Sequence, residues 1–431
     1  MQSAMVSRTT LRAYLNTLSG SGLRLILQAV YFVVLASTLS VADFGVFASS
    51  ISLALIIATG GTFGFSAPLF RAATTRRRLI GYYIGGLYVH LLCSIPVSLT
   101  IATCLHVAIM HKYLSLTAFL AIVASEAVFL RIGDAMWQLN LGLGRYAHGS
   151  AVPVFTSAAR TAAIVLFVIC GGAGLEEWSL FYLAGNAAGA IGCVLLFHPR
   201  IRPRWSLRIF LRRLPESVSH AAASMVLSMQ IELDKLLILF LAGQEAAGIY
   251  ALSIRIIDLV SVPIRSFFPI YAQMLMRRRE ALKDFASRCR IELGIMAVTT
   301  LLFVCFLQVL AYQPNLLGPN VARAYPWFSA LLAVPAAKVL LDYHYELFFA
   351  ANRVFLSTLI TLLILAIKVP AMAAIALSTT NLQSWILPLN GLWLVLYVVS
   401  ATLAWKFLGA SSAKQPEPEA HPSRSLASRP A

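Results

Sequence analysis

Long apolar stretches separated by short basic loops are the feature of this 431-residue chain that most restricts its fold. A transmembrane helix needs about 20 apolar residues, and stretches of that length or longer recur along the whole sequence. Apolar residues make up 59% of the chain and charged residues 12%, a balance that excludes an ordinary water-soluble protein. The sequence therefore predicts an all-α polytopic membrane protein with twelve transmembrane helices. The expected spans lie near 13–39, 44–68, 79–108, 114–140, 149–170, 178–197, 215–242, 246–275, 290–312, 324–350, 353–377 and 384–408.

The loops between these spans differ sharply in charge and so predict the orientation. One set of loops, with the two chain ends, carries 24 lysines and arginines, whereas the alternate set carries only Lys112 and Arg323. Because positive loops stay on the cytoplasmic side, both termini should be cytoplasmic. The net charge of +17 is thereby explained by topology, and no nucleic-acid partner is expected. Trp178, Trp327 and Trp385 open spans on the outer side, which predicts an aromatic belt at the membrane interface.

Two segments six spans apart resemble each other. After the first span the chain contains Asp43-Phe-Gly-Val-Phe-Ala, and after the seventh it contains Ala246-Ala-Gly-Ile-Tyr-Ala. The basic clusters 76–78 and 277–279 repeat at nearly the same offset. An even number of intervening spans preserves orientation, so the pattern predicts two parallel-repeat six-helix bundles. The expected organisation is an N-terminal bundle at 1–198, a basic cytoplasmic linker at 199–214, a C-terminal bundle at 215–408 and a disordered cytoplasmic tail at 409–431.

Fifteen charged residues lie inside the expected spans and away from their ends. A charge at mid-bilayer costs about 2.5–3.5 kcal/mol on insertion scales, so each needs a partner or a function. They are concentrated on spans 1, 4, 5, 7, 8, 10 and 11, which we expect to face an internal cavity, whereas spans 3, 6, 9 and 12 should face lipid. The cations are Arg24, Arg131, Arg160, Lys235, Arg255, Arg265, Lys338 and Lys368. The acids are Glu126, Asp134, Glu232, Asp234, Asp258, Asp342 and Glu346.

Local spacing separates charges that can pair within one helix from those that cannot. Four pairs lie three or four residues apart and so predict ion pairs on one helix face. These pairs are Arg131–Asp134, Arg255–Asp258, Glu232–Lys235 and Lys338–Asp342. Arg24, Arg160, Arg265 and Lys368 have no acid at such spacing. They predict either pairs across helices or an anion site in a water-filled cavity, where a planar guanidinium binds phosphate with two hydrogen bonds.

Glycine, proline and aromatic residues suggest further features of the spans. The run Gly60–Pro68, together with Pro263, Pro269 and Pro335, predicts bends that could serve as hinges, with close packing as the alternative. Span 10 also carries four aromatic side chains that could offer faces to sugar rings, or simply pack between helices. These are Tyr343, Tyr345, Phe348 and Phe349.

Signatures of soluble catalysis and of metal binding do not occur in the sequence. It contains no nucleotide-binding P-loop, no zinc-protease HExxH and no GxSxG nucleophile motif. The eight histidines and six cysteines show no metal-ligand spacing. We therefore predict a non-enzyme with no catalytic residues, metal or cofactor. Directional transport would then need an ion gradient or removal of the product. The acids suited to ion coupling are Glu126, Asp234, Asp258 and Glu346.

Four segments together resemble bacterial polysaccharide repeat-unit (lipid-linked oligosaccharide, Wzx-like) flippases. These proteins belong to the multidrug/oligosaccharidyl-lipid/polysaccharide exporter (MOP) superfamily. The segments are Leu15–Arg24 (LNTLSGSGLR), Ala42–Ala48 (ADFGVFA), Ile231–Gly243 (IELDKLLILFLAG) and Ala247–Arg255 (AGIYALSIR). The resemblance covers spans 1, 2, 7 and 8 directly and the remainder only by span count. It implies two bundles arranged as a V, with these four spans around a central cavity.

The resemblance also implies a function and a site. The family exports an undecaprenyl-pyrophosphate-linked oligosaccharide for O-antigen, capsule or exopolysaccharide synthesis, beside polymerase and chain-length machinery. Membrane-embedded arginines of related peptidoglycan-precursor flippases correspond, by helix position, to Arg24 and Arg255, with Arg160, Arg265 and Lys368 as further substrate-binding candidates. Two other functions stay open at this stage: a cation-coupled multidrug exporter of the same superfamily, and a membrane glycan polymerase or ligase.

Overall fold

The computed structural model describes residues 8–61, 66–75, 77–277, 285–351, 353–378 and 381–409, and the side chains of 8–21 are outside this description. All regular elements within these ranges are helical. The predicted tail from residue 410 onward, the segment 278–284 and the glycine run at 62–65 lie outside the described residues. Within the described part of the chain, nine helices are long and apolar enough to cross a membrane, and a bent pair makes a tenth. The chain is a multi-pass membrane protein of the predicted all-α class.

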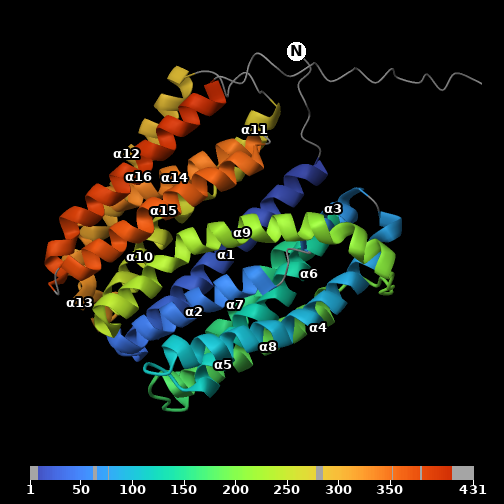
Figure 1. The fold of residues 1–431 in the computed structure, drawn as a ribbon, viewed down its shortest axis with the longest axis horizontal. Helices are drawn as coiled ribbons and strands as arrows, with labels where there is room; N and C mark the ends of the chain where they lie inside the picture. The colour runs from blue at the N-terminus through green and yellow to red at the C-terminus, as the bar shows by residue number, and fades with distance from the viewer. Residues whose placement is uncertain are drawn as a thin grey trace, which may run out of the picture.

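The N-terminal half forms one bundle, which occupies the lower right of Figure 1. Its helices are α1 (Arg8–Thr38), α2 (Val41–Gly61), α3 (Ser66–Thr75), α4 (Ile80–Leu105), α5 (Leu116–Ala124), α6 (Arg131–Gly142), α7 (Tyr146–Ile169) and α8 (Leu175–Phe197). A 3₁₀ turn, η1 (Arg77–Leu79), precedes α4, and a π-helical turn, η2 (His106–Met110), extends it. A second π-helical turn, η3 (Ser125–Leu130), joins α5 to α6, so these three elements make one continuous span.

The C-terminal half forms the second bundle. Its helices are α9 (Leu207–Ala242), α10 (Gln244–Arg265), α11 (Phe268–Arg277), α12 (Phe285–Tyr312), α13 (Pro319–Phe328), α14 (Ala333–Ala350), α15 (Val354–Ser378) and α16 (Ile386–Gly409), with a 3₁₀ turn, η5 (Leu382–Trp385), before α16. The apolar part of α1, Gly22–Thr38, is shorter than a full span, and α9 carries several charges. These two helices therefore account for the difference between the ten apolar spans and the twelve predicted.

The two bundles repeat the same packing. In the first, α1 packs on α7, α7 on α8, and α6 on both α7 and α8. In the second, α9 packs on α15, α15 on α16, and α14 on both α15 and α16. The bundles meet where α2, α10 and α13 gather, and diverge toward the end that carries α3 and α11 (Figure 1). We call the end with α3 and α11 the basic end, because it bears the basic loops. We call the end where α2, α10 and α13 meet the opposite end. The result is the predicted V.

One expectation is confirmed and another is wrong. The bend predicted near Pro335 is present, because the chain turns by 87° between α13 and α14, just before this residue. Trp178, Trp327 and Trp385 are at most 3% exposed, so they pack inside the protein and do not form an interface belt. Their indole rings fill space where helices cross; Trp178, for instance, contacts the rings of Phe47 and Tyr182.

Two of the four aromatic side chains that could have offered faces to sugar rings are buried in the structure. Tyr343 and Phe348 on α14 are each 1% exposed. Tyr343 packs against the rings of Phe268 and Tyr271 on α11. Helix packing, the alternative reading of this stripe, therefore accounts for both, and no ring face is left for a ligand.

Candidate functional site

Three arginines from both bundles approach one another between the arms of the V. Arg24 lies on α1, Arg160 on α7 and Arg255 on α10. The charge of Arg24 is close enough to feel repulsion from the other two and attraction from Asp134. Arg24 and Arg255 are exposed, and neither forms an ion pair or a side-chain hydrogen bond within the described part of the chain. Two guanidinium groups are therefore available to an anion from outside the protein.

Arg160, on α7, is held in place by two side chains of α8. Its Nε donates to Asn186 Oδ1 at 2.7 Å, and the guanidinium lies over the ring of Tyr182, 5.5 Å from the centroid. Its Nη2 is 3.8 Å from Glu126 Oε1, too far for a hydrogen bond, and has no other partner. Glu126 is 2% exposed and accepts a hydrogen bond from the Tyr182 hydroxyl. Arg160 is thus a positioned cation with unused donor capacity.

The buried hydroxyl of Tyr31 belongs to the same region. It has no hydrogen-bond partner among the described residues, and it lies within electrostatic range of Arg160, Arg255 and Glu126. A buried hydroxyl without a partner costs free energy, so a ligand oxygen or a water here would be stabilising. The first bundle, with Arg255 from the second, therefore presents an excess of unpaired positive charge.

The second bundle carries ten of the fifteen charges, and most of them neutralise one another within a helix or between helices. Lys368 on α15 contacts Asp234 on α9 at 2.8 Å, and both side chains are 3% exposed. Asp258 accepts from both Lys338 (2.7 Å) and Arg265 (2.9 Å). The other carboxylates on this side have cations too: Arg265 reaches Asp342 at 2.8 Å, and Lys235 reaches Glu232 at 2.6 Å. Glu346, which is half-buried, forms no ion pair in the described ranges.

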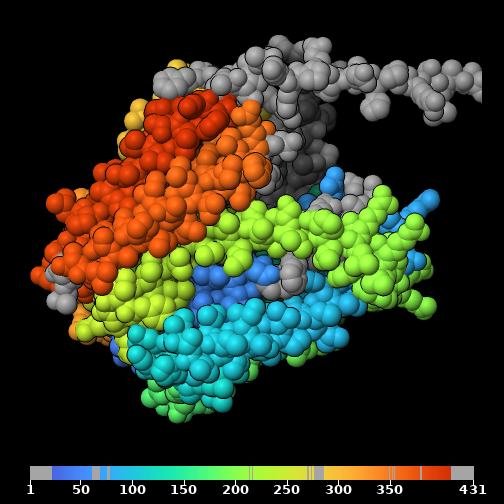
Figure 2. All heavy atoms as spheres, viewed as in Figure 1, coloured from blue at the N-terminus to red at the C-terminus, as the bar shows by residue number. Residues whose placement is uncertain are grey.

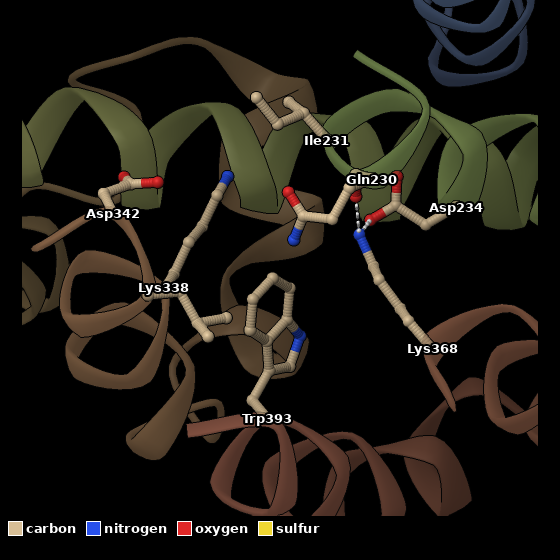
Figure 3. Close-up of a pocket in the computed structure, with 8 residues that line it drawn as sticks. Gln230, Ile231, Asp234, Lys338, Asp342, Lys368 and Trp393 are labelled. Carbon is tan, nitrogen blue, oxygen red and sulfur yellow. Dashed lines mark hydrogen bonds and ion pairs between the residues drawn. The ribbon is translucent and has the colours of Figure 1, made fainter. Parts of the chain in front are cut away.

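A small cavity lies beside the Lys368–Asp234 pair (Figure 3). Its empty space is about 280 Å³, and its walls include Gln230, Lys338 and Asp342. The Lys368 ammonium also donates to the backbone oxygen of Gln230 at 2.7 Å and lies 5.2 Å from the centre of the Trp393 ring. Carboxylate, carbonyl and aromatic face together surround the ammonium, which explains how a lysine is tolerated at this depth.

Of the four ion pairs predicted within single helices, two form. Arg131 contacts Asp134 at 3.4 Å, and Lys235 contacts Glu232. The pairs Arg255–Asp258 and Lys338–Asp342 do not form, because Lys338 and Arg265 occupy Asp258 and Arg265 occupies Asp342. Arg265 and Lys368 therefore have acidic partners on other helices, which was the alternative open from the sequence. Arg24, Arg160 and Arg255 remain as the cations with free capacity.

Sequence reasoning missed a buried polar cluster at the basic end of the second bundle. Glu292 on α12 and His344 on α14 are 3% and 1% exposed. His344 contacts Ser400 Oγ at 2.9 Å and Glu292 at 3.4 Å, and Glu292 also accepts from Tyr397 at 3.1 Å. Glu292 lies two residues into a predicted span, where a charge needs no explanation. In the described residues no group of three or more His, Cys, Asp or Glu could hold a metal ion.

The contact between the bundles is unequal on its two sides. On one side α9 packs against α2 and also reaches α3 and α4. The repeat relates α9 and α2 to α1 and α10 on the other side. Within the described residues, α1 and α10 have at most marginal contact. Instead, α1 contacts α13 at the opposite end. Asn320 on α13 donates there to the backbone oxygens of Ala36 (2.7 Å) and Leu39 (2.6 Å). The seam that carries Arg24 and Arg255 on its walls is thus the looser one.

Comparison with known proteins finds the same fold in solved transporter structures. No family model and no curated protein sequence matches the chain. Among solved structures, it is similar to an inward-facing multidrug resistance MATE family transporter of the MOP superfamily (TM-score 0.66, 14% identity, 91% of this chain and 96% of that one). It is also similar to a Vibrio cholerae MATE transporter (TM-score 0.66, 13% identity, 94% and 98%) and to the lipid II flippase MurJ in an inward closed conformation (TM-score 0.63, 10% identity, 91% and 89%). At these identities the likeness establishes the fold.

Proposed function

We propose that this protein is a flippase that moves an undecaprenyl-pyrophosphate-linked oligosaccharide across the bacterial inner membrane by alternating access. The observation that carries the proposal is the excess of positive charge between the two bundles. Arg24 and Arg255 have no ion pair in the described residues, and Arg160 Nη2 has no hydrogen-bond partner there and lies 3.8 Å from Glu126. A diphosphate would supply the missing counter-charge, and arginine forks suit its oxygens. Transport of this kind requires no bond-making step, so no catalytic group is needed.

The loose seam between α1 and α10 supports a lipid-linked substrate over a wholly soluble one. A polyprenyl chain must stay in the bilayer while its polar head crosses, so the cavity needs a side opening. Exposed apolar side chains on α1, such as Leu23 (50%), Ile26 (61%) and Val30 (42%), suit contact with such a chain. MurJ, one of the structural neighbours, is itself described as a lipid II flippase.

The second candidate is a cation-coupled multidrug exporter, favoured by the half-exposed acid Asp342 and by the MATE neighbours. A cationic drug would be repelled by the arginines near α1, so the two candidates predict opposite responses to Arg24 and Arg255 substitutions. Under both, four acids are proposed for ion coupling: Glu126, Asp234, Asp258 and Glu346.

The test replaces Arg24 and Arg255, each with Ala and with Lys, in a strain lacking its own flippase. Arg→Ala should abolish surface glycan and leave lipid-linked oligosaccharide on the inner leaflet, with protein level unchanged by blot. Arg→Lys should be nearly as harmful although the charge remains, because a point charge cannot make the two-pronged contact. Arg208→Ala, at an exposed position at the basic end, is the matched control. Normal glycan from both Arg→Ala variants would remove these residues from the mechanism, and drug resistance in place of glycan would favour the exporter.

A further inference from the structure

The two glycines that the sequence repeat aligns, Gly45 and Gly248, lie against each other in the structure. Gly45 is in the first turns of α2 and Gly248 in the first turns of α10, so each belongs to a different bundle. A Cβ atom on Gly45 would lie within 3.0 Å of the Gly248 backbone and of Gln244 O. A Cβ on Gly248 would lie even closer to the Val41 carbonyl. The backbones of α2 and α10 are therefore in direct contact at the two glycines that the repeat relates.

This contact lies where the V is closed. Residues 45 and 248 are near the opposite end of the molecule, beside α13, and the bundles diverge away from it (Figure 1). The helices α2 and α10 pack on each other. In Figure 2 the green to yellow-green atoms of α9 lie against the blue atoms of the first bundle. Further bonds between the bundles flank the contact. On the α9 side, Ser52 donates to Glu232 Oε2 at 2.5 Å, and Ser49 donates to the Lys235 backbone oxygen at 3.2 Å.

We infer that the Gly45–Gly248 crossing is the gate that seals the cavity at the opposite end, and that both residues must be glycine for the seal to close. The obstacle that a Cβ would meet is main-chain oxygen and nitrogen, which cannot rotate away as a side-chain tip can. Helices therefore have to move apart if either glycine gains a methyl group. Because the helices belong to different bundles, that movement opens the V at this end.

A single methyl group should consequently shift the protein toward a state that is open at the opposite end. Gly248→Ala and Gly45→Ala should act alike, because the contact is reciprocal. Two other glycines provide matched controls: Gly294 on α12 and Gly391 on α16, where a Cβ would meet nothing within 4 Å. Their Ala variants should leave the conformational equilibrium unchanged or slightly stabilise the helices.

The experiment measures the gap directly. Spin labels are attached to cysteines at Ser40 and Glu245, both exposed near this end, after the six native cysteines are replaced. Pulsed electron–electron distance measurements in nanodiscs should give one short distance for the parent protein and for the Gly294→Ala and Gly391→Ala controls. Gly248→Ala and Gly45→Ala should each show a second population, in which the distance between the labels is longer by several ångströms. Adding Val41→Ala to Gly248→Ala should not restore the short distance between the labels, because the atom that the Cβ of residue 248 would meet is the backbone carbonyl oxygen of residue 41.

Two results would overturn the inference. An unchanged distance distribution in either folded glycine variant would mean that the closed state tolerates the extra methyl group. Failure of both variants to accumulate, with the control variants normal, would make the contact a permanent part of the packing. The inference rests on the alternating access under the proposed function, but its readout uses no substrate. A gate that opens as expected in a protein without flippase activity would therefore separate the two failures.

Discussion

Removing the Lys368 ammonium should destabilise the second bundle by several kcal/mol, whatever the substrate is. Lys368 and Asp234 are each 3% exposed and 2.8 Å apart. Taking away one partner of a buried ion pair costs about 3–5 kcal/mol, because the other charge stays behind without compensation. Asp234 would keep the Tyr250 hydroxyl (2.6 Å) and the Lys235 backbone N–H, so Lys368→Met should fall at the lower end, about 3 kcal/mol.

Thermal unfolding in detergent, followed by intrinsic fluorescence, measures the effect. For a bundle of this size, about 3 kcal/mol corresponds to an apparent midpoint lowered by roughly 6–12 °C. The double variant Lys368→Met/Asp234→Asn should recover most of the loss, because it leaves no unpaired charge. The control is Arg323→Met, which breaks the exposed Arg323–Glu245 pair and should cost at most about 1 kcal/mol. If Lys368→Met costs no more than Arg323→Met, the pair is hydrated and the reasoning fails.

Two further predictions concern orientation and coupling. Reporter fusions at Arg204 and Arg278 should be cytoplasmic and fusions near Glu176 and Pro314 periplasmic, because 24 of the 26 loop and terminal cations lie on one side; a cytoplasmic signal at Glu176 would contradict the twelve-span topology. Replacing the four candidate coupling acids one at a time with the amide should impair transport for one of them at least; normal transport by all four variants, under proton and under sodium gradients, would exclude them from coupling.

The helical architecture was predictable from the sequence because its cause is local. Apolar length, loop charge and the repeat depend only on neighbouring residues and on an offset along the chain. The size of the bend before Pro335 was not predictable, because a proline permits a kink without fixing its angle at 87°. The burial of Trp178 was missed for a similar reason: a tryptophan at the end of a span suits both the membrane interface and a helix crossing, and only the position of Phe47 and Tyr182 decides between them.

The partners of the buried charges could be foreseen in kind but not in identity. The cost of a charge in the bilayer predicts that each has a partner, and the i+3 rule found Lys235–Glu232. It could not find Lys368–Asp234, whose members are 134 positions apart, nor the two cations that compete for Asp258. Those pairings depend on how α9, α10, α14 and α15 cross, which no single-helix pattern contains.

The repeat also places a cation over an aromatic ring in each bundle. The two cations differ in how completely their charge is paired. Arg160 on the fifth helix lies over Tyr182 of the sixth, and Lys368 on the eleventh lies over Trp393 of the twelfth. In the second copy the cation is fully matched by Asp234, whereas in the first Glu126 stands 3.8 Å away and one guanidinium nitrogen has no partner. The same scaffold thus holds one saturated cation and one with spare capacity. A ligand that brings negative charge would gain most beside Arg160. Under the proposed function, this asymmetry of charge would direct the anion toward the first bundle, whereas the ion pairs of the second bundle would stabilise the fold.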